Sequence, residues 1–218
     1  MTHWRRAVAD GAGTALLLAA VVGSGIMGER LAQGNDAIAL LANSLATGFA
    51  LAALIVAFGP RSGAHFNPVV TLALALRGEF ARRDVPAYVV AQFAGALIGV
   101  AAAHLMFDLP LIQYSLKARS SFGLWWSEAV ATFGLVLVVL SCQRAPAWAA
   151  PLAVSSYIAA AYWFTASTSF ANPAVTLARG FTDTFAGIAP NHVMAFIAAQ
   201  VLGAGLAVLA DRAWPATS

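Results

Sequence analysis

The heptapeptide Asn-Pro-Val-Val-Thr-Leu-Ala occupies residues 67–73, and it returns with one change as Asn-Pro-Ala-Val-Thr-Leu-Ala at residues 172–178. Asparagine is a favoured helix N-cap, and proline suits the first helical position because the N–H that it lacks would have no partner there. Each copy therefore predicts the start of a short helix. Both stretches run to Arg-Gly, and the two glycines, Gly78 and Gly180, are typical of residues that end a helix.

The chain around these motifs is too apolar for a soluble protein. Of its 218 residues, 61% are hydrophobic and 10% are charged, whereas a soluble domain carries about 25% charged residues. A helix needs about 20 apolar residues to cross a bilayer, and the two stretches that begin with Asn-Pro, 67–77 and 172–179, are too short to cross. The stretches that we interpret as spans are 8–27, 38–58, 85–107, 122–141, 149–166 and 190–210.

The two halves of the chain carry the same pattern. The motifs lie 172 − 67 = 105 residues apart, and Asp10-x-x-x-Thr14 is matched by Glu128-x-x-x-Thr132. The motif Ala91-Gln-Phe-Ala-Gly95 is matched in the same way by Ala199-Gln-Val-Leu-Gly203. Because each half has an odd number of spans, the second half enters the membrane inverted. The sequence predicts one channel domain, 1–218, made of inverted repeats at about 1–110 and 120–218.

Small residues recur every fourth position in the third and sixth spans. Ala91, Gly95 and Gly99 share one helical face, and Ala199 and Gly203 do the same. Such faces let two helix backbones approach closely inside a bilayer. We therefore expect close helix packing at both places.

The basic residues favour one orientation in the membrane. With the N-terminus inside, the cytoplasmic segments contain Arg5, Arg6, Arg61, Arg77, Arg82, Arg83, Arg144 and Arg212. The outer segments contain Arg30, Lys117, Arg119 and Arg179. The larger positive count predicts that both termini are cytoplasmic, in the cell inner (plasma) membrane. These topogenic charges also account for the net charge of +3 without a nucleic-acid partner.

Two opposed half-helices would direct their positive N-terminal ends at one central point. The amides of Asn67 and Asn172 would donate hydrogen bonds there, and the non-helical backbone before each motif, 59–66 and 165–171, would line a water-filled path with carbonyl oxygens. Such a centre repels cations and interrupts proton relay along water. The motifs thus predict a channel for neutral hydroxylated molecules.

The loop Ser62-Gly-Ala-His-Phe-Asn-Pro68 and the triplet Asn172-Pro173-Ala174 resemble the signatures of the aquaporin and aquaglyceroporin superfamily. The resemblance implies an all-α membrane protein with the inverted-repeat hourglass fold: six transmembrane helices plus two re-entrant half-helices. It also implies a homotetramer in the lipid bilayer, passive flux and no cofactor. His65 resembles a loop histidine of the family, which we interpret as structural, with pH gating as the alternative. Asp10 and Glu128 are expected to hydrogen-bond the loop backbone.

The sequence departs from the family at both motifs. The first reads Asn67-Pro68-Val69, so valine adds bulk beside the centre, and Val175 stands where most members have arginine. Family spacing implies a selectivity filter that is wide, apolar and free of arginine. Its predicted members are Thr47, Ala160, Ser169 and Val175. Arg179, four residues later, either lies at the outer rim of the pore or only favours the end of the half-helix.

A filter without arginine resembles that of bacterial aquaglyceroporins associated with arsenic operons. This resemblance suggests glycerol, urea, arsenous acid or methylated arsenicals as solutes, together with water. A plain water channel and a channel that also passes small anions remain as alternatives. An ion-coupled transporter is disfavoured because the ionisable residues Asp10, His104, Glu128 and Asp211 are expected near span ends. An enzyme is disfavoured because no nucleophile–base set or metal cluster converges, and Cys142 is the single cysteine.

Overall fold

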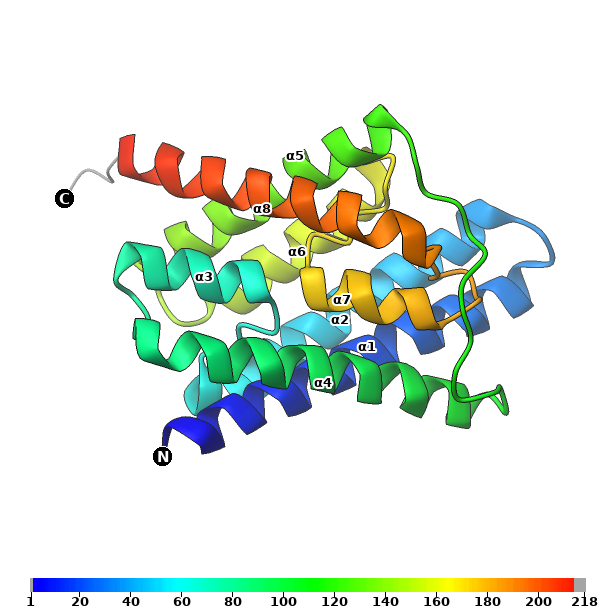
Figure 1. Cartoon of the computed structure of the whole chain (residues 1–218), viewed down its shortest axis with the longest axis horizontal. Helices are drawn as coiled ribbons and strands as arrows, with labels where there is room; N and C mark the ends of the chain where they lie inside the picture. Colours follow the sequence, from blue (N-terminus) through cyan, green and yellow to red (C-terminus); the bar gives the residue numbers. More distant parts are fainter. Residues whose placement is uncertain (1, 214–218) are drawn as a thin grey trace.

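The computed structural model describes residues 2–213, and this part of the chain is helical without a β-strand. Figure 1 shows six long helices around two short ones. The long helices are α1 (His3–Ala32), α2 (Asp36–Ser62), α4 (Val85–Met106), α5 (Phe122–Cys142), α6 (Ala149–Phe164) and α8 (Pro190–Ala213). The short ones are α3 (Pro68–Arg77) and α7 (Pro173–Ala178), and the 3-10 turns are η1 (Arg82–Asp84) and η2 (Arg179–Phe181).

Five helices are long and apolar enough to cross a membrane, and the sixth, α6, is shorter. The 16 residues of α6 correspond to about 24 Å of helix. It ends two residues before the predicted boundary because Thr165 adopts an extended conformation. From that point the chain continues through the bundle as the non-helical segment that leads to α7.

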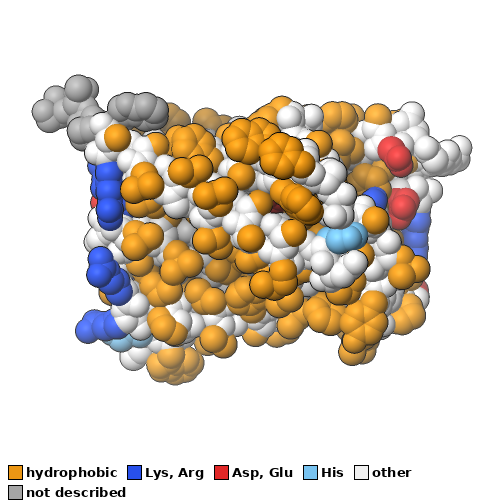
Figure 2. All heavy atoms as spheres, turned by 45° about the horizontal axis from the view of Figure 1, so that its top comes forward, with side chains coloured by type: hydrophobic (Ala, Val, Ile, Leu, Met, Phe, Trp, Pro, Cys, Tyr) orange, Lys and Arg blue, Asp and Glu red, His pale blue; other side chains and the backbone are white. Residues whose placement is uncertain are grey.

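Helix α1 begins and helix α8 ends at the same end of the bundle (Figure 1). We call this the basic end. Figure 2 shows Lys and Arg side chains gathered there, at the left, and apolar side chains across the middle of the molecule. Arg77 forms an ion pair with Asp211 at this end, with 2.7 Å between Nε and Oδ2. The two chain ends themselves, Met1 and residues 214–218, lie outside the described residues.

Glycines bring two helix pairs into backbone contact. A Cβ atom on Gly95 would lie 2.1 Å from the carbonyl oxygen of Gly11, so the backbones of α4 and α1 are in contact there. A Cβ atom on Gly203 would lie 2.2 Å from the carbonyl oxygen of Ala129, so the backbones of α8 and α5 are in contact there. The prediction of close packing on these small-residue faces is confirmed at both places.

The short helices α3 and α7 begin near the middle of the bundle and run toward opposite ends (Figure 1). The prediction for Gly78 is confirmed, since it ends α3 in the left-handed conformation with φ 82°. The prediction for Gly180 is wrong: it lies inside η2 and is not left-handed. Neighbouring loops satisfy the carbonyls of that turn, since Ile188 N–H donates to Arg179 and Ser115 N–H donates to Gly180.

Candidate pore and selectivity filter

Two buried carboxylates hold the segments that precede the short helices. Asp10 accepts the backbone N–H groups of His65 at 2.9 Å and Phe66 at 3.0 Å. Glu128 accepts those of Phe170 and Ala171, both at 2.9 Å. Both acids are fully buried, and Glu128 lies about a third of the way along α5. Both acids are therefore buried between helices, within about the first third of α1 and α5, and there they bind loop backbone.

These hydrogen bonds require an unusual backbone. Ala64 and Phe66 have φ near 50° in the first half, and Ser169 and Ala171 have φ near 50° in the second. The left-handed conformation is uncommon for residues other than glycine, and it turns successive N–H groups toward one acceptor. The left-handed residues recur at the motif offset of 105, because 169 − 64 and 171 − 66 both equal 105.

Two glutamines, which sequence reasoning did not single out as site residues, complete the support. Gln92 donates through Nε2 to Asp10 at 2.8 Å and to Thr71 at 2.9 Å. Gln200 donates in the same way to Glu128 at 2.6 Å and to Thr176 at 2.7 Å. Each glutamine thus ties a carboxylate to a short helix. The repeated Ala-Gln pair in the sequence was the signal that could have identified them.

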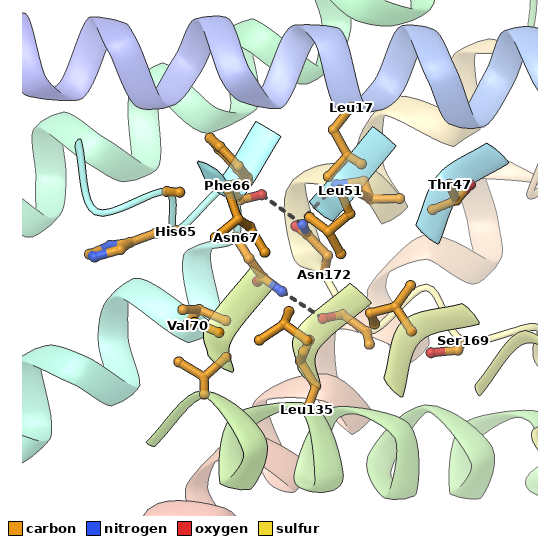
Figure 3. A pocket seen from close by; sticks show the side chains of 18 of the residues that line it. Leu17, Thr47, Leu51, His65, Phe66, Asn67, Val70, Leu135, Ser169 and Asn172 are labelled. Carbon is orange, nitrogen blue, oxygen red and sulfur yellow. Dashed lines mark hydrogen bonds between the residues drawn. The ribbon is translucent and has the colours of Figure 1, made fainter. Parts of the chain in front are cut away.

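The two asparagines meet at the centre of the bundle. Each caps its own helix, since Oδ1 of Asn67 accepts from Val69 N–H and Oδ1 of Asn172 accepts from Ala174 N–H, both at 3.0 Å. Each Nδ2 donates across to the other half: Asn67 to Ala171 O and Asn172 to Phe66 O, both at 2.8 Å (Figure 3). Because an amide nitrogen carries two hydrogens, each asparagine keeps one N–H for a passing molecule.

A cavity passes these asparagines and continues toward both ends of the bundle. At the basic end its wall includes Cys142 and Gln143, and at the other end it includes Arg179. We call these ends the Cys142 mouth and the Arg179 mouth. Apolar residues dominate the wall, and several of them appear in Figure 3: Leu17, Leu51, Val70 and Leu135. The wall is therefore mostly apolar, with polar groups at the centre and at both mouths.

Three of the four predicted filter residues, Thr47, Ser169 and Val175, line this cavity. The prediction for Ala160 is wrong, because Ala160 is exposed on α6 and does not belong to the lining. Two residues along a helix correspond to a rotation of about 200°, so Tyr162 occupies the inward face instead. Its hydroxyl lies 3.2 Å from Thr47 Oγ1. The lining thus contains an aromatic side chain that family spacing did not predict.

Arg179 lines the cavity rather than lying at an exposed rim. It is 2% exposed, its guanidinium carbon lies 3.4 Å from the centre of the Phe170 ring, and Nε donates to Ala186 O. A guanidinium therefore lines the same cavity as Thr47, Ser169 and Val175, at the mouth where the sequence offered Arg179 as a rim residue.

The remaining predicted residues have positions outside the path or beside it. Val69 is buried but does not line the cavity, whereas Val70 does, so the extra bulk of the first motif lies away from the path. His65 is in the lining, and its Nδ1 lies 3.0 Å from Thr71 Oγ1. Its ring packs against Phe80 and Tyr88, with centroid distances of 4.8 and 5.2 Å. These contacts on several sides fit a structural role for His65.

We expect thiol reagents to slow flux only in part and only through Cys142. This is the single cysteine of the chain, it lines the Cys142 mouth, and position 169 in the lining is a serine instead of a thiol. A charged methanethiosulfonate should reduce glycerol uptake by proteoliposomes, and Cys142→Ser should abolish the effect. Block of equal size in Cys142→Ser would contradict this assignment.

Comparisons with known proteins agree with this geometry. The family model described as "Major intrinsic protein" matches residues 1–146. The chain is 56% identical over 208 residues to aquaglyceroporin AqpS of Rhizobium meliloti (strain 1021), which covers 95% of this chain and 89% of that protein. It is 33% identical over 138 residues to aquaporin NIP1-2 of Arabidopsis thaliana, over 58% of this chain and 47% of that one.

Among solved structures, the aquaglyceroporin from Plasmodium falciparum superimposes with a TM-score of 0.73 over 96% of each chain. The two sequences are 19% identical, so this similarity shows the fold alone. The family model and aquaglyceroporin AqpS also match this chain in sequence, over most of its length. This protein therefore belongs to the major intrinsic protein family, whose members are membrane channels and not enzymes.

Proposed function

We propose that the chain is a passive channel for small neutral hydroxylated solutes, with glycerol and urea as the primary candidates and arsenous acid or methylated arsenicals as further ones. Water passes as well. The observation that carries this proposal is the pair of asparagine amides, each with one N–H left for a solute, in a cavity with an otherwise mostly apolar wall. A polyol or urea can hydrogen-bond to such amides while its carbon side contacts the apolar wall.

The proposed orientation places the basic end in the cytoplasm. Figure 2 shows Lys and Arg side chains gathered at this end, and cytoplasmic segments carry an excess of Lys and Arg. In a bacterial cell this is an inner-membrane channel with the Arg179 mouth outside. We further propose that the two halves are inverted repeats and that four copies assemble, each with its own pore.

A stopped-flow panel on proteoliposomes tests the function. Water, glycerol, urea and arsenite should each equilibrate faster than in empty liposomes, and no solute should accumulate against its gradient. Passage of water with exclusion of glycerol and arsenite would leave a plain water channel. Accumulation against a gradient would indicate a coupled transporter.

We expect Val175→Arg to reduce the flux of large solutes more than that of water. Val175 is buried in the lining, one helical turn before Arg179, so a second guanidinium would crowd and repel the first. A crowding cost of about 1–3 kcal/mol, the size found for overpacked interiors, would decrease glycerol flux by about five- to 150-fold if it is added to the permeation barrier. Val175→Leu, which adds bulk without charge, should have a smaller effect. Glycerol uptake at the wild-type rate in Val175→Arg would contradict the placement of Val175 in the filter.

A further inference from the structure

Two buried arginines lie together at the Arg179 mouth without an acidic partner. The guanidinium carbons of Arg179 and Arg119 lie 3.4 and 5.0 Å from the centre of the same Phe170 ring. Arg179 is 2% exposed and Arg119 is 8% exposed. The ion pairs among the described residues are His3–Asp84, Arg83–Asp84 and Arg77–Asp211, and they involve other side chains.

The two arginines differ in how fully their donors are used. Arg119 donates through Nε to Gly187 O at 2.9 Å and through Nη1 to Ser167 O at 3.1 Å, so it holds two loops. Among the described residues Arg179 has one protein acceptor, Ala186 O, which takes its Nε–H. The two terminal nitrogens of Arg179 therefore keep their N–H groups, and this side chain lines the cavity.

A second polar group at the same mouth also has no partner. The hydroxyl oxygen of Ser169 is buried and has no hydrogen-bond partner among the described residues, and Ser169 is 3% exposed. It lines the cavity, and Figure 3 shows its hydroxyl directed inward, toward the asparagines. A buried hydroxyl without a partner is costly, so both Ser169 and Arg179 offer unused hydrogen bonds to a molecule in the cavity.

The surrounding charge favours a negative molecule. Glu128 is the carboxylate that acts on both arginines, but its oxygens already accept Phe170 N–H, Ala171 N–H and the Gln200 amide. Lys117, in the adjacent loop, adds a third cation: partial burial and the charges of Arg119 and Arg179 lower its pKa, whereas the acids Glu29 and Asp36 raise it. Positive groups that converge on a cleft with low-dielectric walls concentrate anions.

We propose that the Arg179 mouth contains an anion-binding site in which Arg179 and Ser169 hydrogen-bond a small monoanion with oxygen acceptors, such as a carboxylate or sulfonate. Arg119 and Lys117 contribute charge, and Phe170 positions the guanidinium. The planar guanidinium can donate two parallel hydrogen bonds to such a group. The proposal rests on the channel function for its location in the conduction path. The bound anion either passes through the pore or competes with neutral solutes there.

The test uses methanesulfonate, which stays ionised and does not cross lipid as an acid, with dimethyl sulfone as its neutral counterpart. In proteoliposomes of the full chain, methanesulfonate should slow glycerol uptake or carry a current in a gradient, and dimethyl sulfone should do neither. With the detergent-purified protein, methanesulfonate should raise the thermal unfolding midpoint above that in chloride at equal ionic strength, since a ligand stabilises the state that it binds.

Arg179→Met removes the guanidinium and keeps an apolar stem against Phe170. A hydrogen bond to a charged group is worth about 1.5–3 kcal/mol, so the half-effective methanesulfonate concentration should rise by about tenfold or more. Arg179→Lys and Ser169→Ala should each weaken the effect less. Arg30→Met is the matched control, since Arg30 is exposed at the same end and does not line the cavity, and it should behave as wild type.

Two results would overturn the site: methanesulfonate without effect on wild-type flux, current and unfolding, or effects unchanged in Arg179→Met. If Arg179→Met does not fold, unchanged effects in both Arg179→Lys and Ser169→Ala would overturn it. The unfolding measurement separates this proposal from the channel function. Anion binding in a protein that passes no glycerol would refute the proposed solutes and support the anion site. Glycerol flux without anion binding would support the proposed solutes and refute the anion site.

Discussion

Glu128→Ala is expected to abolish solute flux and to leave little folded protein. The carboxylate accepts three hydrogen bonds, from Phe170 N–H, Ala171 N–H and the Gln200 amide. Each hydrogen bond to a charged group contributes about 1.5–3 kcal/mol. The sum is comparable with the whole stability of a typical protein, about 5–15 kcal/mol. The left-handed residue Ala171 would also lose the acceptor of its own N–H group.

Recovery by size-exclusion chromatography, the unfolding midpoint and glycerol flux measure this effect. Glu128→Gln keeps one acceptor oxygen, so it should be less severe than alanine. Glu79→Ala removes an exposed glutamate whose side chain makes no hydrogen bond in the described part of the chain, and it should match wild type. A folded, fully conducting Glu128→Ala protein would show that the loop before α7 holds its shape by other means.

Gly203→Ala is expected to separate α8 from α5 although it adds a single methyl group. That methyl carbon would lie 2.2 Å from Ala129 O and 3.1 Å from Ala129 Cα, so backbone atoms would have to move. The matched control is Gly205→Ala in the same helix, where a Cβ atom would meet nothing within 4 Å. In a helix, alanine is more favourable than glycine by about 1 kcal/mol, so the two substitutions should change stability in opposite directions.

The unfolding midpoint and the yield of folded protein decide this comparison. Gly203→Ala should lower both, and Gly205→Ala should leave them unchanged or raise them. Equal midpoints for the two variants would mean that α5 and α8 are not in backbone contact at Ala129.

The fold was predictable because its determinants repeat in the sequence. The two Asn-Pro motifs identified the short helices, and the matched Asp10 and Glu128 identified the acids that bind the loops. These features depend on local preferences and on spacing within one helix, which the sequence displays directly. Helix boundaries were less predictable, since Gly180 lies in a turn whose carbonyls are satisfied by loops distant in the chain.

The lining was predicted less well because it depends on helix rotation and side-chain direction. Counting back from Asn172 led to Ala160, whereas the inward face of α6 presents Tyr162. Counting forward led to Val175 as an uncharged filter residue, and the buried Arg179 lines the same cavity. An error of two residues turns a helix by about 200°, nearly to its opposite face.

The crossed hydrogen bonds of the asparagines determine when the pore centre can exist during synthesis. Asn67 donates to Ala171 O, and Asn172 donates to Phe66 O. A ribosome that has delivered α1 to α4 into the membrane has made Asn67 but not yet its acceptor, which follows 104 residues later. The crossed contacts at the centre can therefore form only after the segment before α7 has been made, and a chain truncated between the halves leaves Nδ2 of Asn67 without its acceptor.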